Sequence, residues 1–297
     1  METPLPTVPA PGPAGPPAPT DWSRVPAPGG GPRSGFGVGT IVSQTFRIWW
    51  RDLPVFTLLA AVASAPLAWA MYRLYGASAE LLVPDPAAPF EHLARIYAQI
   101  GGLWVLSFVL GAIKLGAIAH AATLRLRGGK AGLGEMLSVG LGRSFAMAGM
   151  LLVALAATLG TLCLVVPPFL LLCGWAAASP AIAVENASPI RALGRSWQLT
   201  EGYRWRILGG VLLVYFASLV LTTALQGVLT GGVASWPGTM SSMTADQLRA
   251  LAVPMGVLQL AGGIVFVPML VASAVIHHGL RLVKEGGDPV QLADVFE

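Results

Sequence analysis

The sequence predicts an all-α, polytopic helical membrane protein with six transmembrane helices, arranged as three hairpins that are each preceded by an interfacial amphipathic helix. Composition is the first observation behind this prediction. Apolar residues make up 55% of the chain and charged residues 11%, whereas roughly 25% of an ordinary soluble domain is charged. The second observation is that uncharged apolar runs of about 20 residues recur along the chain, which is the length that crosses a bilayer as a helix.

The net charge of +4 does not indicate a nucleic-acid partner. The basic residues are spread over short segments beside apolar runs, which is the pattern of charges that set membrane topology. The two cysteines, Cys163 and Cys173, lie within apolar runs on either side of Pro167-Pro168 and are predicted to be buried small hydrophobic residues. A disulfide across that turn is the alternative. We expect no metal and no cofactor.

Residues 1–39 are predicted to form a disordered cytoplasmic tail. They hold eleven of the 24 prolines and then a glycine-rich run, so they have almost nothing to bury. We expect polyproline II character in the first part and no signal peptide, because a basic start followed by an apolar core is missing. A plain tether is the favoured role, and a ligand for a partner's proline-binding groove is the alternative.

The first ordered element is expected at residues 40–53, as a helix half sunk in the membrane interface. Val42, Phe46 and Trp49 share one helical face, while Arg47 and Arg51 lie off it. This helix leads directly into the first span, residues 53–75, whose only charge is near its outer end.

The second, third and fourth spans follow. The second, residues 100–121, contains Lys114 about 10 Å from the inner end, so its ammonium can reach the headgroups. A basic loop then leads to the forty uncharged residues 145–184, which are twice as long as one crossing needs and must fold as a hairpin. The turn is placed at Pro167-Pro168, which leaves a third span of 22 residues and a shorter fourth span from Phe169.

A polar and basic segment separates the fourth span from the fifth and predicts the most clearly marked interfacial helix. Ser188 can cap its first turn, with Pro189 at the first helical position. Leu193 and Trp197 then recur on an apolar face, while Arg195 falls on another side of the helix.

The fifth and sixth spans are expected at residues 206–230 and 251–276. They complete a membrane domain over residues 40–285 and leave residues 286–297 as a short tail. One side of the predicted arrangement carries most of the arginines and lysines, and the other side only Arg73, Arg95 and Arg249. The positive-inside rule therefore predicts a multi-pass inner-membrane protein with both ends in the cytoplasm.

Arginine and tryptophan side chains beside the spans are predicted to anchor the chain to the anionic inner leaflet. A weak repeat supports this interpretation, because TFRIWW, LGRSF and LGRSW occupy equivalent places before the first, third and fifth spans. The predicted anchors are Arg47, Trp49, Trp50, Arg51, Arg143, Trp197, Arg204, Trp205 and Arg206.

Two segments resemble a known family. Residues 180–205, PAIAVENASPIRALGRSWQLTEGYRW, and residues 276–292, IHHGLRLVKEGGDPVQL, are similar to the best-marked segments of the glycerophosphoryl diester phosphodiesterase membrane-domain family of bacterial membrane proteins and its relatives. The spacing of the whole chain after the tail fits this family as well. The positions that fit its pattern are Glu185, Ala192, Leu193, Arg195, Ser196, Leu199, Arg281, Glu285, Gly286 and Asp288.

The chain also departs from the family pattern. His277 and His278 stand where aromatic residues are usual, and Gly279 stands where an aspartate is usual, so a role tied to that acidic position does not carry over. The resemblance does not imply an enzyme, since the phosphodiesterase chemistry of that family resides in a separate soluble, metal-dependent barrel.

Glu185, at the inner end of the fourth span, is the strongest candidate for a functional residue. A carboxylate at that depth needs a partner, and the favoured interpretation is a structural ion pair; proton or cation binding is the alternative. His277 and His278 point about 100° apart on a helix and complete no metal site, so they are interpreted as a pair at the membrane edge. The whole candidate polar cluster is Glu185, Arg191, Arg195, Lys114, His277, His278 and Arg281.

Three functions remain open. The leading hypothesis is a non-enzymatic scaffold or accessory subunit whose basic amphipathic helices hold the anionic inner leaflet, and whose tail or loops recruit protein partners. The second is a transporter or channel subunit for a small solute or lipid, for which the threefold repeat is the supporting feature. The third is an intramembrane enzyme acting on lipid, which would have to use the candidate polar cluster.

Overall fold

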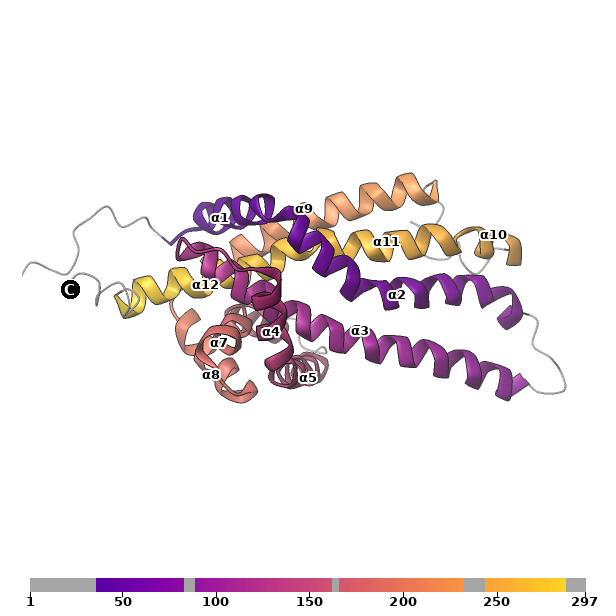
Figure 1. Cartoon of the computed structure of the whole chain (residues 1–297), viewed down its shortest axis with the longest axis horizontal. Coiled ribbons are helices and arrows are strands. Elements are labelled where there is room, and N and C mark those ends of the chain that lie inside the picture. The colour runs from indigo at the N-terminus through magenta and orange to yellow at the C-terminus, as the bar shows by residue number, and fades with distance from the viewer. Residues whose placement is uncertain (1–35, 83–88, 162–165, 232–243, 287–297) are drawn as a thin grey trace, which may run out of the picture. The chain divides into compact units, whose positions relative to one another are not determined.

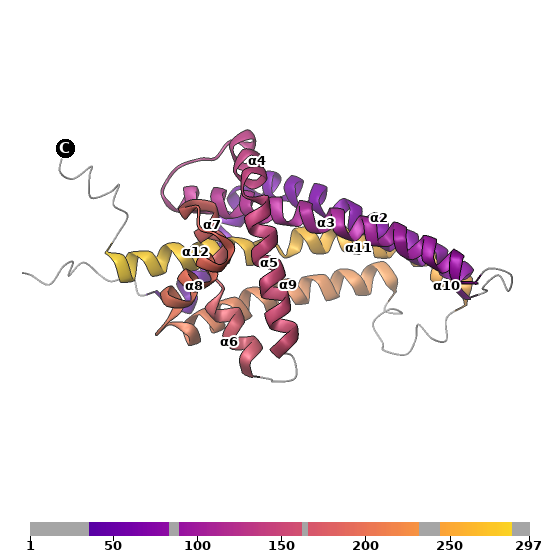
Figure 2. The same cartoon turned by 90° about the horizontal axis from the view of Figure 1, so that it is seen from below.

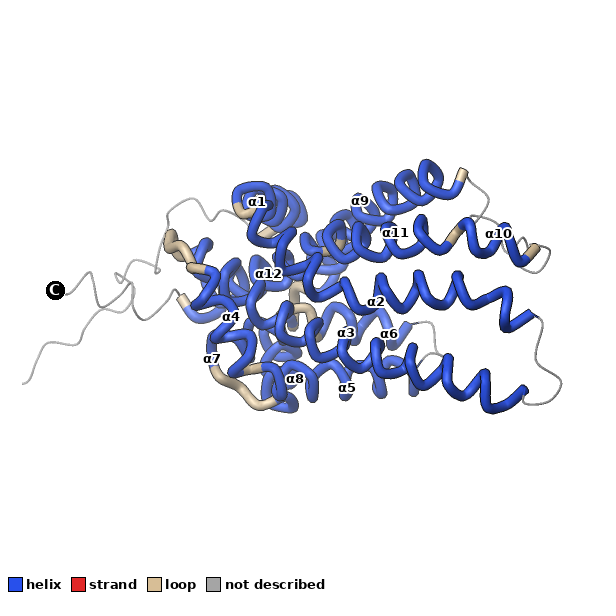
Figure 3. The backbone as a smooth tube through the Cα atoms, turned by 45° about the vertical axis from the view of Figure 1, so that its right-hand side comes forward, coloured by secondary structure: helices blue, strands red, loops and turns tan. Residues whose placement is uncertain are grey.

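The computed structural model describes residues 36–82, 89–161, 166–231 and 244–286. The chain divides into two units, Met1–Gly35 and Phe36–Glu297, and only the second contains described residues. The predicted disordered tail thus lies almost wholly outside the described residues, as does the predicted tail beyond residue 286. Every regular element in the described ranges is a helix (Figure 3), which confirms the all-α prediction.

Five helical segments are long and apolar enough to cross a membrane, and the chain is accordingly a helical membrane protein. These segments are Leu53–Gly76, Ile100–Leu126, Ser144–Thr161, Arg204–Thr230 and Ala245–Glu285. The first two belong to α2 (Leu53–Leu82) and α3 (Pro89–Leu126), and the next two are α5 (Ser144–Thr161) and α9 (Arg204–Thr230). The last consists of α10 (Ala245–Ala250), α11 (Ala252–Val265) and α12 (Val267–Glu285).

The predicted fourth span is not among these five. It is divided into two short helices, α6 (Val166–Gly174) and α7 (Ala178–Glu185). Pro180 lies in the first turn of α7 and has no N–H to continue a helix from α6. The exact arrangement of six spans therefore stays a prediction.

A short helix precedes three of the candidate spans by no more than a few residues. These helices are α1 (Val38–Arg51), α4 (Leu133–Gly142) and α8 (Pro189–Thr200), which stand before α2, α5 and α9. Each has a buried and an exposed side: α1, for example, buries Ile41, Thr45 and Ile48 and exposes Arg47 and Trp50. The structure thus has a short helix before each of α2, α5 and α9, whereas the grouping of the spans into three hairpins stays a prediction.

Helix α12 is the central element of the described unit, because it contacts α1, α3, α7, α8 and α9 (Figure 1). One side, with Val271 and Val275, packs with residues of α2 and α3, and another side, with Ile276 and Leu280, packs with residues of α1 and α9. Gly279 lets the ring of Phe36 approach, since a Cβ there would lie 2.7 Å from that ring. Phe36 and Gly37, inside the predicted tail, are thus packed at the start of α1.

The last segment is bent where α11 meets α12. Pro268 has no N–H, so the helical bond to the carbonyl of Ile264 cannot form, and the neighbouring carbonyl of Val265 instead accepts a hydrogen bond of 3.1 Å from Ser218 Oγ of α9. Helix α11 also approaches α2 closely, because Gly256 and Gly263 face it without side chains.

Helices α2, α3, α9 and α11 run broadly alongside one another, whereas α5 runs across their direction, as Figures 1 and 2 together show. Helices α4, α7 and α8 lie around the α12 end of this group (Figure 2). This end carries the residues of the candidate polar cluster.

Candidate functional site

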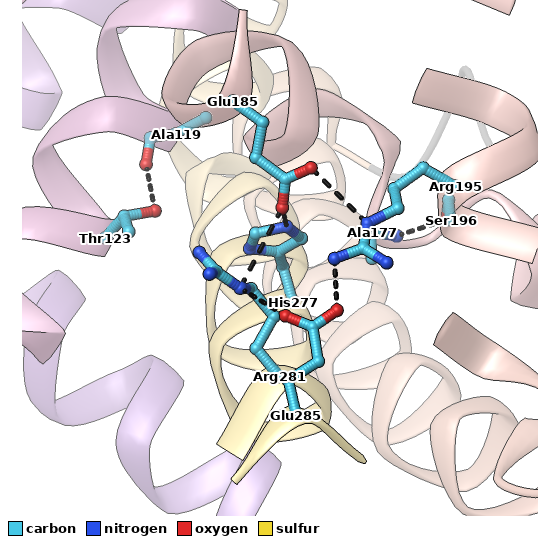
Figure 4. Close-up of polar contacts among 9 residues, drawn as sticks. All are labelled: Ala119, Thr123, Ala177, Glu185, Arg195, Ser196, His277, Arg281 and Glu285. Carbon is cyan, nitrogen blue, oxygen red and sulfur yellow. Dashed lines mark hydrogen bonds and ion pairs between the residues drawn. The ribbon is translucent and has the colours of Figure 1, made fainter. Parts of the chain in front are cut away.

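The polar cluster is built by three helices that meet at the inner end of the predicted fourth span. Glu185 is the last residue of α7, where Asn186 adopts a left-handed conformation with φ of 55° and ends the helix. After this turn, Pro189 begins α8 and brings Arg195 back toward α12. Figure 4 shows Glu185 and Arg195 facing the side of α12 that carries His277 and Arg281.

The carboxylate of Glu185 has three partners. Its Oε1 accepts a hydrogen bond from His277 Nε2 at 3.1 Å and lies 3.9 Å from Arg281 Nε. Its Oε2 lies 3.4 Å from Arg195 Nε. Since an ionised carboxylate only accepts hydrogen bonds, Nε2 of His277 must carry the proton.

Glu285 completes the cluster from the last turn of α12. It accepts a hydrogen bond of 2.9 Å from Arg281 Nε and a second one from Arg195. Two carboxylates and two guanidinium groups therefore alternate, and their formal charges cancel. The polar cluster, as the term is used below, consists of Glu185, Arg195, His277, Arg281 and Glu285.

The cluster is half enclosed by the protein. The side chain of His277 is 1% exposed, while those of Glu185 and Arg195 are 24% and 34% exposed. The hydrogen bond from His277 holds the pKa of Glu185 below its usual value; burial opposes this shift, and the charges of Arg195 and Arg281 reinforce it. Nδ1 of His277 is buried and has no hydrogen-bond partner within the described residues.

The structure brings together four of the predicted cluster residues, namely Glu185, Arg195, His277 and Arg281. Two other residues of the predicted cluster make no contact with Glu185 in the described structure. Lys114 lies on α3, and its neighbours Ala112 and Leu115 pack apolar surface against α5 and α7. Arg191 lies on the exposed side of the first turn of α8. His278 occupies the position after His277, about 100° further round α12.

Two residues near the cluster were missed by the sequence-based prediction. Glu285 was matched only to the family pattern, although its place four residues after Arg281 is the spacing of a helical ion pair. Lys284 Nζ donates a hydrogen bond of 2.7 Å to the carbonyl of Gln198 near the end of α8. Together with the cluster, this bond fastens α8 to α12.

A second polar contact closes the break between α6 and α7. Ser196 Oγ donates to the carbonyl of Gly174 at 2.7 Å and accepts from the backbone N–H of Ala177 at 3.1 Å. The same carbonyl lies 3.4 Å from Thr200 Oγ1. The ring of Trp197 fills the space beside Gly174, where a Cβ would lie 2.2 Å from Trp197 Cε3. The groups left unpaired by the broken helix are thus satisfied by α8.

Several predicted membrane anchors contact the protein itself. Arg143 donates to the carbonyl of Ile182 at 2.7 Å, and Arg204 stacks on the ring of Trp197 with its guanidinium carbon 4.0 Å from the ring centre. Arg206 lies 3.3 Å from the carbonyl of Phe36. Trp49 is half-buried in α1.

Other predicted anchors are open to their surroundings. Trp50 and Trp205 are 72% and 84% exposed, and Arg47 and Arg51 are exposed beside Trp50. Because α1 contacts α9, the exposed tryptophans stand in neighbouring elements of the fold.

Two further polar contacts hold the C-terminal end of α3. Arg125, near the end of this helix, makes two hydrogen bonds to the carboxylate of Asp52, one of them 2.6 Å long, at the joint between α1 and α2. His120 Nε2 lies 2.9 Å from Glu135 Oε1 of α4. In the part of the chain that the structure describes, no group of three or more histidine, cysteine, aspartate or glutamate side chains could hold a metal ion.

Comparisons of the chain with models of protein families, with curated proteins and with solved structures find no match. The resemblance to the phosphodiesterase membrane-domain family therefore stays a prediction.

Proposed function

We propose that this protein is a non-enzymatic membrane scaffold or accessory subunit that holds the anionic inner leaflet of a bacterial cell membrane through its interfacial helices. The observation that carries the proposal is the exposed set of arginines and tryptophans on α1 and at the start of α9. Trp50 and Trp205 suit the layer where a membrane meets water, and each exposed arginine near an anionic surface contributes about 1 kcal/mol of attraction.

The polar cluster supports a structural role rather than a catalytic one. Each carboxylate is bound to guanidinium groups of the same protein, so neither Glu185 nor Glu285 is open to act on a substrate. The cluster joins α7, α8 and α12, each of which contacts the other two. We propose that its function is to hold α8 in position at the membrane surface.

The proposal places both ends of the chain in the cytoplasm and the basic helices on the same side. This orientation follows from the distribution of arginine and lysine, and it holds whether or not the α5–α7 segment crosses the membrane completely, since that segment returns to the side on which it starts. The tail and the cytoplasmic loops would recruit protein partners.

Native co-purification tests the scaffold function. The protein is tagged at its C-terminus, extracted into lipid nanodiscs and analysed by mass spectrometry, in parallel with a variant that lacks residues 1–39. We expect partner proteins in stoichiometric amounts and anionic lipids in excess over their share of the membrane. Recovery of the protein with a single enriched solute, and with no partner protein in either form, would contradict the proposal.

One observation favours a transporter or channel subunit as the second candidate. Two apolar segments are interrupted, at residues 175–177 and at Phe266, and they touch through Ser179 and Ser273, whose hydroxyl oxygens are 2.9 Å apart. Interrupted helices are typical of transporter sites. Solute flux into proteoliposomes that is lost in Ser179→Ala or Ser273→Ala, with the folded yield unchanged, would favour this function.

The third candidate, an enzyme acting on lipid, depends on Glu185. It predicts that Glu185→Gln folds normally and loses lipid turnover, whereas the scaffold proposal predicts a folding defect in the same variant.

A further inference from the structure

Helix α5 has fully buried residues only in its first two turns. Met147 and Met150 are buried with residues of α3 and α7, and Gly149 faces Pro189 at the start of α8. Beyond Leu151 no residue of α5 is buried, and the exposed large side chains are Leu152, Val153, Leu155 and Leu159. A helix that crossed the membrane alongside α3 would be expected to contact it over most of its length.

The direction of α5 accounts for this short contact. Figure 2 shows α5 running across the direction shared by α2, α3 and α11. With 18 residues it is about 27 Å long, so it could cross a hydrocarbon core of roughly 30 Å only by standing nearly upright. Because α2, α3, α9 and α11 contain the other candidate spans, a helix that runs across them lies along the membrane plane.

The returning limb, α6, ends close to the interfacial helix α8. The break after Gly174 is closed by Ser196 of α8, and Cys173 packs with Ile207 in the first turn of α9. Counted back from Gly174, the nine residues of α6 span only about 13 Å along the helix axis. Gly174 is therefore placed near the same membrane surface as the start of α9.

We propose that α5 and α6 form a hairpin embedded in the inner leaflet, which enters and leaves on the same side, so that the described part of the chain crosses the membrane four times. The crossings are α2, α3, α9 and the segment of α11 and α12. The exposed apolar side of α5 contacts the acyl chains of one leaflet. This proposal rests on the proposed function, which identifies that leaflet as the inner one.

Two features favour acyl chains as the partner of this surface. The exposed side of α5 adds to an apolar surface that α3 already presents, with Leu106 and Val109 among its exposed residues. The polar side chains of α5 are Ser144 at its start and Thr158 and Thr161 in its last turn, and Arg143 directly precedes the helix. The middle of the helix therefore presents only apolar side chains, as expected for a surface in contact with acyl chains. A second copy of the chain is the competing partner and is an outcome of the test.

Depth measurements along α5 test the proposal directly. Single cysteines replace Phe145, Leu152 and Leu159 in a full-length protein that carries Cys163→Ser and Cys173→Ala, and a fluorophore on each is quenched by lipids that carry spin labels at shallow or deep positions. We expect the ratio of shallow to deep quenching to be nearly constant along α5. An upright helix would change depth by about 21 Å between the first and last of these sites, at 1.5 Å per residue.

Helix α9 supplies the matched control, because Leu213 and Val228 are also exposed and lie fifteen residues apart. Labels at these two positions should differ in depth by about 22 Å. A gradient along α5 as steep as that along α9 would overturn the proposal. Disulfide-linked dimers through Leu155→Cys at low protein-to-lipid ratio, with labels on α5 unquenched by either lipid, would also overturn it and identify a second copy as the partner.

Labelling with a membrane-impermeant maleimide separates this proposal from the orientation on which it rests. In intact cells we expect Asp246→Cys to react, and neither Lys130→Cys nor Thr161→Cys; in inverted vesicles, Lys130→Cys should react. Reaction of Thr161→Cys from outside would overturn the hairpin alone. Reaction of Lys130→Cys from outside, with constant depth along α5, would overturn the inner-leaflet assignment and leave the hairpin standing.

Discussion

At the scale of single residues, the most constrained site is the contact between α8 and the break after α6. Ser196 binds both the carbonyl of Gly174 and the N–H of Ala177, and the ring of Trp197 leaves no room for a side chain at Gly174. A hydroxyl that donates and accepts at once can satisfy both groups of an interrupted helix. Glycine at 174, serine at 196 and tryptophan at 197 are thus each required by the way α8 packs on the break.

Replacement of Ser196 by alanine removes both hydrogen bonds. The buried carbonyl and N–H are then unpaired, which should lower the free energy of unfolding by about 1–3 kcal/mol. Thermal unfolding in nanodiscs measures the change. Ser138→Ala is the control, because that hydroxyl bonds only to the carbonyl of Glu135 on an exposed turn, and its loss should change stability by less than about 0.5 kcal/mol. Equal effects of the two substitutions would contradict this account.

Gly174→Ala should also destabilise the protein, because its Cβ would overlap the ring of Trp197. The effect should shrink when Trp197 is replaced by alanine, so that the double variant is more stable than the sum of the two single changes predicts. A double-mutant cycle on thermal stability measures this coupling. Additive effects would show that the two positions do not interact.

Glu185 is the residue whose charge matters most to the cluster. Glu185→Gln leaves Arg281 and Arg195 with one carboxylate instead of two, and it should lower the folded yield and reduce the free energy of unfolding by about 1–3 kcal/mol, less than for a fully buried pair because the side chain is partly exposed. Glu135→Gln is the matched control, since it also removes a carboxylate bound to a histidine, but a more exposed one. Normal folding of Glu185→Gln with a lost activity would favour the transporter or enzyme function.

The lowered pKa of Glu185 also predicts a dependence on pH. A carboxyl group whose pKa is lower in the folded state stabilises the fold above its unfolded pKa of about 4.3, and this contribution is lost as the pH falls through the folded pKa. Thermal unfolding between pH 7 and pH 3 should therefore show a steeper loss of stability in the unaltered protein than in Glu185→Gln. Parallel curves for the two proteins would contradict the assignment.

At the scale of elements, the fold depends on joints between short interfacial helices and the spans they precede. Asp52 lies between α1 and α2 and is bound by Arg125 at the end of α3, so this residue also connects the start of α2 with the end of α3. Asp52 had no predicted role, because the sequence does not show that the end of α3 returns to this joint.

Asp52→Asn should loosen α1 while leaving the spans intact, since it removes the charge that holds Arg125 at the joint. Hydrogen–deuterium exchange should increase over residues 38–51 and change little in α9. Asp246→Asn is the control, because Asp246 pairs with Arg249 on an exposed turn. An unchanged exchange rate in α1 would show that packing alone fixes its position.

The sequence predicted those elements whose signals are local. Apolar runs located the candidate spans, and a basic or aromatic flank located the short helices before α2, α5 and α9. The interruption at residues 175–177 was missed although Pro180 is a local signal for it, because the groups that satisfy the broken helix, Ser196 and Trp197, lie about twenty residues further along the chain. Lys114 was assigned to the polar cluster on depth alone, and depth does not determine which way a side chain points from its helix.

At the scale of the whole molecule, the proposal places one end of the described unit at an anionic surface. Arg47 and Arg51 are exposed there on α1, and Arg249 is exposed on α10, beyond the opposite ends of the spans. Attraction to anionic lipid should therefore depend on the first two arginines and not on the third.

Replacement of Arg47 and Arg51 by glutamine should reduce the stabilisation that anionic lipid provides by about 2 kcal/mol, at about 1 kcal/mol for each charge. The measurement compares unfolding temperatures in nanodiscs of phosphatidylglycerol and of phosphatidylcholine, and the difference should shrink as salt is added. Arg249→Gln should leave the difference between the two lipids unchanged. If Arg249→Gln removes this difference and the replacement of Arg47 and Arg51 does not, the protein has the opposite orientation in the membrane.

The central position of α12 has a consequence for how the protein is made. It is the last described helix to be translated, yet α1, α3, α7, α8 and α9 all pack against it. Until residues 267–285 emerge from the ribosome, the earlier helices enter the bilayer before α12 can pack against them, and Glu185 lacks two of its partners, His277 and Arg281. Insertion of the earlier helices and completion of the fold are thus separate events in time, and in a chain that stalls before α12 the carboxylate of Glu185 has Arg195 as its partner but neither His277 nor Arg281.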